Sequence, residues 1–292
     1  SRRFAYSVTK PLQDISKEML KVRGDYGELH FDRYKYPEIN VIADTTRKMS
    51  RNVKDYLNRI EKEKQIRQEF FSNASHELKT PITSIQGYAE LLESGMIVDE
   101  EMKADFARRI KKEAENMTGL INDILMISRL EAKDAEVVFS QVRISVLLDD
   151  ILDSLKPLAA QSQVFIHSDC QPISIEANPQ QMKELLNNLI TNAVKYNRPG
   201  GQVWIQIREK GDAMLIRVRD NGMGIPEDSL DRIFERFYRV DKGRSRKQGG
   251  TGLGLSIVKH IVSFYQGTIR VSSELDKGSE FVVELPLQRG HA

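Results

Sequence analysis

Residues 187–196 read NNLITNAVKY, and this stretch of the 292-residue sequence decides the fold. Together with Glu184, which lies just upstream, the polar residues Asn188, Asn192 and Lys195 recur every three or four positions. A helix places residues at this spacing along one side. The stretch therefore predicts a helix that presents a carboxylate, two amides and an ammonium on a single side.

Strands are predicted on the C-terminal side of this helix. Residues 203–207 (VWIQI) and 214–218 (MLIRV) are rich in β-branched residues and partly alternate apolar with polar positions. Helical stretches lie between such runs from about residue 137 onward. We therefore predict a mixed α/β domain, an α/β sandwich, over residues 134–292.

The N-terminal half is predicted to be helical. It is dense in Lys, Arg, Glu, Ile and Leu at helical spacing, and one helical segment runs from about Arg51 to Glu93. Gly95 suits the left-handed turn that closes a helix, and Asp99 is a suitable N-cap for a second helix. Two long helices joined by a short connection form an antiparallel hairpin, which we place at residues 56–133.

Each hairpin helix carries an apolar stripe. A stripe this broad cannot be covered within one hairpin, so we expect a homodimer that forms a four-helix bundle. His76 lies about 200° around the helix from Leu78, at about 100° per residue, and should point outward. The predicted buried positions are Phe71, Ser75, Leu78, Ile82, Ile85, Ala89 and Leu92 in the first helix, and Phe106, Ile110, Ala114, Met117, Ile121, Ile124 and Leu125 in the second.

The composition excludes several classes of protein. The formal net charge is +2, from 44 basic and 42 acidic residues. This small excess gives no strong positive electrostatic field that would favour nucleic acid as a partner. The single cysteine cannot form an intrachain disulfide. No stretch approaches the roughly 20 apolar residues of a membrane-spanning helix, and we expect residues 1–292 neither to cross a membrane nor to be exported.

Residues 71–81, FSNASHELKTP, resemble the phosphoacceptor box of histidine kinases. A neutral imidazole nitrogen of His76 can attack phosphorus, and the neighbouring carboxylate of Glu77 can hold the ring tautomer and accept the proton. The resemblance implies that Glu77 and Thr80 also help to dephosphorylate a phosphorylated partner, with Thr80 placing the water that hydrolyses it. Pro81 is expected to bend the helix beside His76.

Residues 187–196 resemble the N-box of the ATP-binding domain that histidine kinases share with type II topoisomerases, certain heat-shock chaperones and mismatch-repair ATPases. In this resemblance the polar side of the helix, Glu184 included, faces ATP. We assign Mg²⁺ to Asn192 with Asn188 in support, because an amide oxygen is a hard ligand. Lys195 offers a point charge to the phosphates, and Tyr196 offers its ring to adenine.

Three further boxes follow in the order of this family. Residues 220–225, DNGMGI, resemble the G1 box, in which Asp220 accepts the adenine amine and the glycines admit the base. Residues 233–239, IFERFYR, resemble the F-box, and residues 249–255, GGTGLGL, the G2 box, which precedes a helix near Leu253. Residues 241–248 have the composition of a mobile lid. The nucleotide-binding residues assigned in these segments are Asp220, Gly222, Gly224, Ile225, Arg239, Lys242, Gly250, Thr251, Gly252, Leu253, Gly254 and Leu255.

The resemblance implies a sensor histidine kinase. Such an enzyme uses ATP and Mg²⁺ to phosphorylate His76 and passes the phosphoryl group to an aspartate in the receiver domain of a response regulator. Phosphatase activity toward that regulator is a further expectation, and the balance between the two activities is open. Whether His76 is phosphorylated within a subunit or across the dimer also stays open.

Residues 1–55 resemble a HAMP signal-relay segment, with Pro11-Leu12 before one helical run and Glu38-Ile39 before another. An irregular helical linker is the alternative. A HAMP segment would imply upstream membrane helices, and so the cytoplasmic portion of an inner-membrane or plasma-membrane protein. Two rival functions share some of these motifs: an ATPase of the chaperone or topoisomerase kind, which has no use for the His76 box, and a non-catalytic dimeric scaffold.

Overall fold

The computed structural model describes residues 2–21, 29–131, 137–240 and 250–287. The chain forms two compact units, residues 1–72 and 73–292. Helix α2 runs from Pro37 to Glu93 and belongs in part to each.

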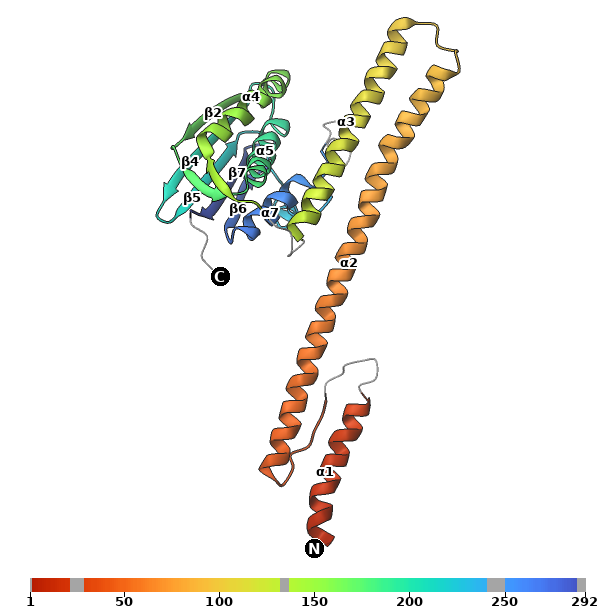
Figure 1. Cartoon of the computed structure of the whole chain (residues 1–292), viewed down its shortest axis with the longest axis vertical. Coiled ribbons are helices and arrows are strands. Elements are labelled where there is room, and N and C mark those ends of the chain that lie inside the picture. The colour runs from red at the N-terminus through yellow and green to blue at the C-terminus, as the bar shows by residue number, and fades with distance from the viewer. Residues whose placement is uncertain (1, 22–28, 132–136, 241–249, 288–292) are drawn as a thin grey trace. The chain divides into compact units, whose positions relative to one another are not determined.

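The first unit pairs two helices around a small apolar cluster. Helix α1 spans Arg2–Lys21, and the first part of α2 runs beside it in the same direction (Figure 1). Ile15 of α1 packs with Ile39 and Ala43 of α2. This helix-connector-helix arrangement is compatible with the predicted HAMP-like segment, whose identity stays a prediction.

The helix starts in this unit differ in part from the sequence-based expectation. Helix α1 contains Pro11 instead of following it, whereas α2 begins at Pro37, next to the Glu38-Ile39 pair expected to precede a helical run, and continues without a break into the segment predicted from about Arg51. Proline is well tolerated at the first position of a helix, and Glu38 is favourable in the first turn. No Gly or Pro interrupts residues 38–80, so the helix continues across the predicted domain boundary at residues 55 and 56 and on through Pro81.

The second unit begins with the predicted helical hairpin. Helix α2 ends at Glu93, and Gly95 has a φ of +67°. The carboxylate of Asp99 accepts a hydrogen bond of 2.9 Å from the Glu101 amide and so caps helix α3, Glu100–Glu131. The rings of Tyr88 and Phe106 join the two helices, with 5.3 Å between their centroids. The hairpin and its connection are therefore as predicted.

The predicted apolar stripe on α3 is partly wrong for the single chain. Leu120 and Ile127 are buried, although neither was assigned to it, whereas Ile121 and Leu125 are 43% and 48% exposed. The reason is that α3 packs against helix α7 as well as facing α2, so it has more than one covered side. The exposed positions are those that a second copy of the hairpin would cover in the predicted dimer.

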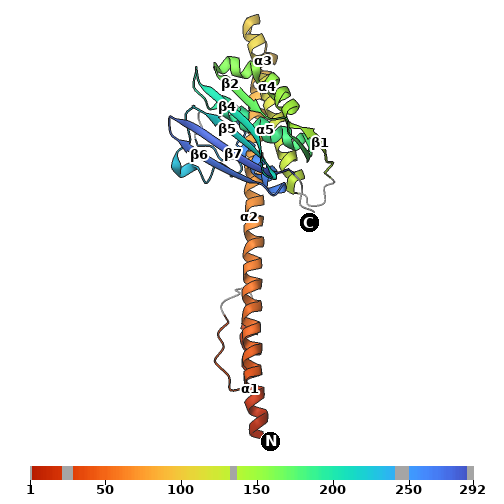
Figure 2. The same ribbon diagram turned by 90° about the vertical axis from the view of Figure 1, so that its left-hand side faces the viewer.

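A five-stranded sheet forms the base of the α/β domain. Its strand order is β2-β4-β5-β7-β6, seen most clearly in Figure 2. Only the β2–β4 pair is parallel, and β4 pairs with β5 so that Ile205 lies opposite Val218. The strands are β2 (Phe165–Cys170), β4 (Gln202–Lys210), β5 (Ala213–Asp220), β6 (Thr268–Glu274) and β7 (Gly278–Pro286), and a separate ribbon joins β1 (Ser140–Arg143) to β3 (Ser174–Ala177).

Three helices cover one face of this sheet: α4 (Ile144–Ser162), α5 (Pro179–Lys195) and α7 (Gly254–Phe264) (Figures 1 and 2). Alternate residues of β4, namely Val203, Ile205 and Ile207, are buried, as the period of a strand with one covered face requires. Leu189 and Ile190 of α5 are buried as well. The predicted helical hairpin followed by an α/β sandwich is confirmed.

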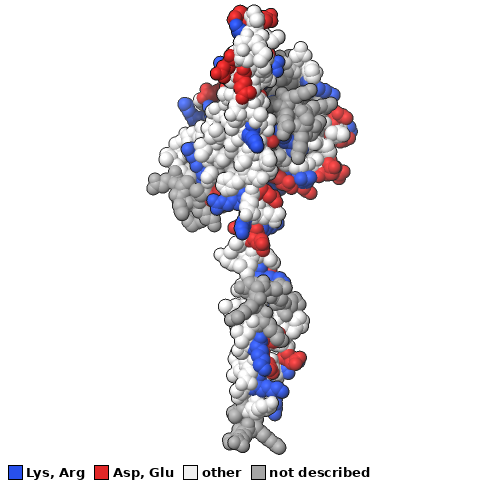
Figure 3. All heavy atoms as spheres, turned by 90° about the vertical axis from the view of Figure 1, so that its right-hand side faces the viewer, with Lys and Arg blue, Asp and Glu red and all other residues white. Residues whose placement is uncertain are grey.

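Two observations concern membrane-spanning helices and the distribution of surface charge. No helix among the described residues is long and apolar enough to cross a membrane. Acidic and basic side chains both appear on the face drawn in Figure 3, and neither sign forms a continuous field there. This mixture agrees with the near balance of charges in the sequence.

Candidate functional site

Helix α5 positions the polar side chains that the sequence singled out. Asn178 caps its first turn by accepting a hydrogen bond of 3.0 Å from the Gln181 amide, and Pro179 follows at the first helical position. Asn188 donates from its amide to the carbonyl of Glu184 at 2.9 Å, one turn earlier on the same side. The cap and this contact fix the register in which Glu184, Asn188, Asn192 and Lys195 lie along the helix.

The start of α7 meets this polar side of α5. A Cβ atom on Gly254 would lie 2.5 Å from Oδ1 of Asn188, so a larger residue at this position would displace the Asn188 amide. Leu253 is buried, and its amide lies 3.2 Å from the hydroxyl of Thr251, which can accept a hydrogen bond from it. The glycine-rich segment before α7 is thereby placed beside Asn188, with a helix N-terminus that favours anions.

Asp220 ends β5 with one carboxylate oxygen engaged and one available. Oδ1 accepts hydrogen bonds from the amides of Gly222 at 2.8 Å and Ser279 at 3.3 Å. Among the described residues, no hydrogen bond reaches Oδ2. Burial raises the pKa of Asp220, and the two amide hydrogen bonds oppose that rise. Asp220 is 8% exposed, and an acceptor oxygen without a partner on such a residue suits a ligand that brings its own donor.

The two glycines that follow Asp220 are required by close backbone approaches. A Cβ on Gly222 would lie 2.4 Å from the carbonyl oxygen of Tyr196, at the end of α5. Gly224 has a φ of +68°, and its Cβ would lie 2.1 Å from the carbonyl oxygen of Glu274. Ile225 continues this turn with its amide donating to Ser273 Oγ at 2.8 Å. The segment therefore forms a tight cradle between α5 and the β6–β7 turn.

The F-box lies against the G2 box. The Phe237 amide donates to the Gly252 carbonyl at 2.9 Å, and a Cβ on Gly252 would lie 2.9 Å from the backbone of Phe237. Gly250 and Leu255 flank this contact in sequence. Lys242 and the rest of the predicted lid, residues 241–248, lie outside the described residues.

Lys195 is a half-buried cation at the end of α5. Burial lowers its pKa, and the carboxylate of Asp123 opposes that effect. Within residues 2–21, 29–131, 137–240 and 250–287 the Lys195 ammonium forms no ion pair. Because an unpaired ammonium is costly away from water, this position favours an anionic ligand. Neighbouring Tyr196 is also half-buried, and burial raises the pKa of its hydroxyl.

His76 is exposed on α2, as the helical spacing predicts. Thr80 lies one turn further on, and its hydroxyl donates to the His76 carbonyl at 3.3 Å. Glu77 is paired with Arg239 of the F-box at 3.1 Å and not with the His76 ring. Consecutive helical residues do not face each other, which explains why Glu77 reaches a different partner.

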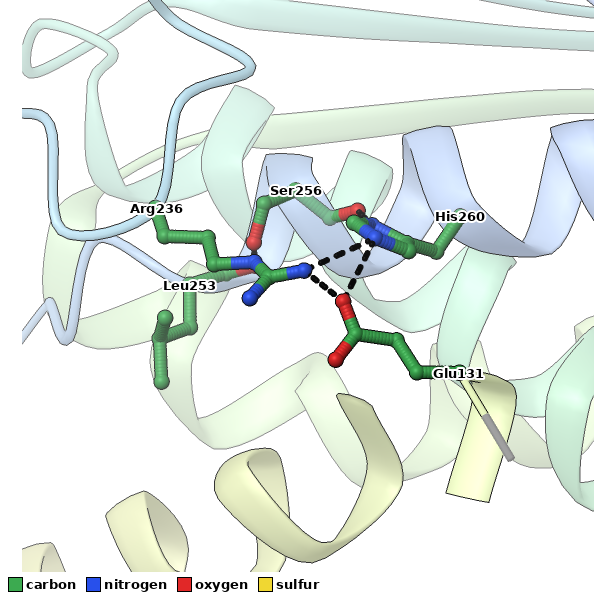
Figure 4. A network of polar contacts seen from close by, with 5 residues as sticks. All are labelled: Glu131, Arg236, Leu253, Ser256 and His260. Atoms are coloured by element: carbon green, nitrogen blue, oxygen red, sulfur yellow. Dashed lines mark hydrogen bonds and ion pairs between the residues drawn. The ribbon is translucent and has the colours of Figure 1, made fainter. Parts of the chain in front are cut away.

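Two further polar bridges join α3 to the catalytic domain, and neither was predicted. Thr251 donates to Asp123 at 2.9 Å. Arg236 donates to both Glu131 and His260, with 3.2 Å between its nitrogen and Nε2 of His260 (Figure 4). One signal was available for Asp123: it shares a side of α3 with Leu120 and Ile127, three residues before and four after, which are both buried.

The comparisons with known proteins agree with this site. Residues 66–133 match the family model of the His Kinase A (phospho-acceptor) domain, and residues 177–289 match that of the histidine kinase-, DNA gyrase B- and HSP90-like ATPases. The chain belongs to the bacterial sensor histidine kinases. The first match contains His76, and the second contains all four segments that surround Asp220 and Lys195.

Relatives of this histidine kinase include the sensor protein kinases WalK of Staphylococcus saprophyticus and Staphylococcus aureus. Both are 38% identical over 225 residues, or 76% of the chain. The chain spans 37% of the length of the first relative and 54% of that of the second.

Solved histidine kinases share its fold. Full-length ShkA in complex with AMPPNP has a TM-score of 0.57 at 28% identity, over 77% of this chain and 47% of that one. AdeS from Acinetobacter baumannii has a TM-score of 0.58 at 23% identity, over 73% and 98%.

Proposed function

We propose that this chain binds ATP with Mg²⁺, phosphorylates His76 and passes the phosphoryl group to an aspartate of a response regulator. One observation carries the proposal: residues far apart in sequence converge where Gly254 meets Asn188 and Gly222 meets Tyr196. This junction combines a buried aspartate, a cradle lined by glycine and a lysine that has no ion-pair partner in the described part of the chain. ShkA, which is 28% identical, was solved in complex with AMPPNP, and this supports nucleotide binding by the shared fold.

The adenine end of the site is assigned to the β5 end. Asp220 offers its available oxygen to the exocyclic amine, and its engaged oxygen holds the loop in place through Gly222 and Ser279. Gly224 and Ile225 shape the floor, and the Tyr196 ring contributes an apolar contact. This geometry recognises a planar base with an amine donor.

The phosphate end of the site is assigned to the junction of α5 and α7. Lys195 supplies a positive charge, and Thr251 with the amides of residues 250–254 supplies donors at the start of α7. Asn192 would hold Mg²⁺ through its amide oxygen, with Asn188 in support, and phosphate oxygens and waters would complete the ligand set. No group of three or more His, Cys, Asp or Glu side chains suited to a metal occurs in the described part of the chain.

The phosphoryl transfer requires a neutral His76. A ring nitrogen attacks the γ-phosphorus, the new P–N bond forms as the bond to the leaving ADP oxygen breaks, and the ring loses a proton. Glu77, the next residue in the chain, is proposed to receive that proton, and for this it must leave Arg239. The reaction therefore demands a rearrangement of the contact between the hairpin and the F-box.

The next partner is proposed to be the receiver domain of a response regulator. His76 and Thr80 are both exposed on α2, where a second protein can reach them. ThkA, whose structure was solved with the response regulator TrrA, has a TM-score of 0.60 at 21% identity and bears on the fold alone. Phosphatase action through Thr80, the homodimer, and membrane attachment of the parent protein as its cytoplasmic portion stay predictions.

The test is labelling with γ-labelled ATP and Mg²⁺. The wild type should acquire label that is lost in acid and stable in base, and His76→Gln should acquire none. His30→Gln, which removes another exposed histidine, is the matched control and should label normally. ATP hydrolysis without label would favour the chaperone-like ATPase, and absence of ATP binding would favour the scaffold.

A further inference from the structure

Three carboxylates on the hairpin each bind a residue of the catalytic domain. Glu77 pairs with Arg239, Asp123 with Thr251, and Glu131 with Arg236, which also contacts His260 of α7 (Figure 4). All three carboxylates therefore engage the F-box or the G2 box. Thr251 and Arg239 are among the residues assigned to the nucleotide, so this contact and the nucleotide draw on the same groups.

Asp123 is the carboxylate that reaches furthest toward the phosphate end. Its Oδ2 accepts the hydrogen bond of 2.9 Å from Thr251, while the Leu253 amide lies 3.2 Å from the same hydroxyl. The charges that act on Asp123 are those of Glu184, which raises its pKa, and Lys195, which lowers it. Asp123 thus lies within electrostatic reach of two α5 residues assigned to the nucleotide.

The surroundings of Asp123 make its negative charge costly. The side chain is partly buried where α3 packs against α7, and burial raises its pKa to about 6 in spite of the hydrogen bond from Thr251. Any phosphate that uses Thr251 and Lys195 brings more negative charge to the same place. Like charges at close range repel, and one hydroxyl proton cannot serve two anions at once.

We propose that Asp123 sets the affinity of the site for nucleotide phosphates, because its carboxylate competes with them for the Thr251 hydroxyl and lies within electrostatic reach of Lys195. The hairpin thereby carries its own anionic competitor on the helix that is paired with the His76 helix. Binding of the phosphates displaces Asp123 and loosens the contact between α3 and the start of α7. This inference rests on the proposed ATP site and adds to it a residue outside the four nucleotide boxes.

The test compares ATP, ADP and adenosine as ligands of the whole chain. Asp123→Asn keeps the size of the side chain and removes its charge. We expect its Kd for ATP to fall roughly tenfold, which corresponds to about 1.4 kcal/mol, its Kd for ADP to fall less, and its Kd for adenosine to stay unchanged. Asp123→Ala should shift the values in the same direction, so the result does not depend on one variant folding well.

Two control variants separate competition from general loosening. Asp105→Asn removes a carboxylate from the same helix that pairs only with Arg108 and Arg109 of α3, and it should change none of the three affinities. Glu131→Gln weakens the contact to Arg236 and His260 and leaves the Asp123–Thr251 hydrogen bond in place. Any increase in affinity should therefore be equal for ATP and adenosine.

An unchanged ATP affinity in both Asp123 variants, with a wild type that binds ATP, overturns the inference and leaves the proposed function intact. An equal gain for adenosine and ATP also overturns it, because the phosphates would then not be the competing group. Failure of every variant and of the wild type to bind ATP overturns the proposed function and the inference together.

Discussion

Substituting Gly224 by alanine tests the tight cradle beside Asp220. The residue has a φ of +68°, and an L-residue in the left-handed region costs roughly 1–2 kcal/mol. The new Cβ would lie 2.1 Å from the Glu274 carbonyl oxygen, whereas ordinary contact begins at 3.4 Å, so the backbone must move by 3.4 − 2.1 = 1.3 Å. Overpacking of this kind costs about 1–3 kcal/mol. The expected loss of stability is therefore about 2–5 kcal/mol.

Gly211 supplies the matched control. It lies in the turn between β4 and β5 with a φ of +61°, and nothing lies within 4 Å of its added Cβ. Gly211→Ala meets the left-handed cost alone, and the lower entropy of the unfolded chain offsets the same amount, about 0.4–1 kcal/mol, in both variants. The difference between the two variants therefore isolates the steric contact with Glu274.

The assay is urea unfolding followed by the fluorescence of Trp204, the only tryptophan of the chain, which lies on β4. ADP binding at low urea provides a second readout, which Gly224→Ala should abolish and Gly211→Ala should preserve. Equal destabilisation by the two substitutions, to within about 0.5 kcal/mol, would refute the argument from the close approach.

Three more outcomes are expected. Burial raises the pKa of Asp123 from 3.8 to about 6, so ionised Asp123 destabilises the folded protein. This loss of unfolding free energy is absent below about pH 4 and reaches about 3 kcal/mol above about pH 6. Asp123→Asn should therefore raise the melting temperature at pH 8 and not at pH 4, and an equal shift at both would contradict this. Arg239→Ala removes a cation assigned to the nucleotide and should slow labelling of His76 about tenfold or more, although it also releases Glu77 from its ion pair; normal labelling would exclude the nucleotide role of Arg239. Asn178→Ala removes the cap of α5 and should cost about 1 kcal/mol in urea unfolding, so an unchanged midpoint would count against the cap.

Much of the fold could be predicted because its signals are local. Gly95 and Asp99 mark the turn of the hairpin, and the left-handed φ and the N-cap hydrogen bond are both present. The alternation in residues 203–207 predicts a strand with one buried face, and β4 buries Val203, Ile205 and Ile207. Caps, turns and alternation depend on a few neighbouring residues, so sequence alone reports them.

The sequence-based predictions were incomplete or wrong where the surroundings of a residue depend on segments distant in the chain. The helical run after Glu38-Ile39 and the segment predicted from about Arg51 form one helix, α2, because a stretch without interior Gly or Pro has no boundary. The stripe on α3 was misassigned because a spacing rule gives each helix one covered side, whereas α3 packs on α7 as well. The pairing of Glu77 with Arg239 could not be read from adjacency to His76, since the partner lies 162 residues away.

The sequence was enough to predict the order of the two domains, the family and the residues that can take part in catalysis or binding, from His76 to the glycines around Asp220. Only the tertiary structure decided how those residues are paired. Asp123 and Thr251 are 128 residues apart, and Glu131 and Arg236 are 105 apart. Local propensity and periodicity act over a few residues, whereas a contact between helices depends on packing, which no single stretch of sequence encodes.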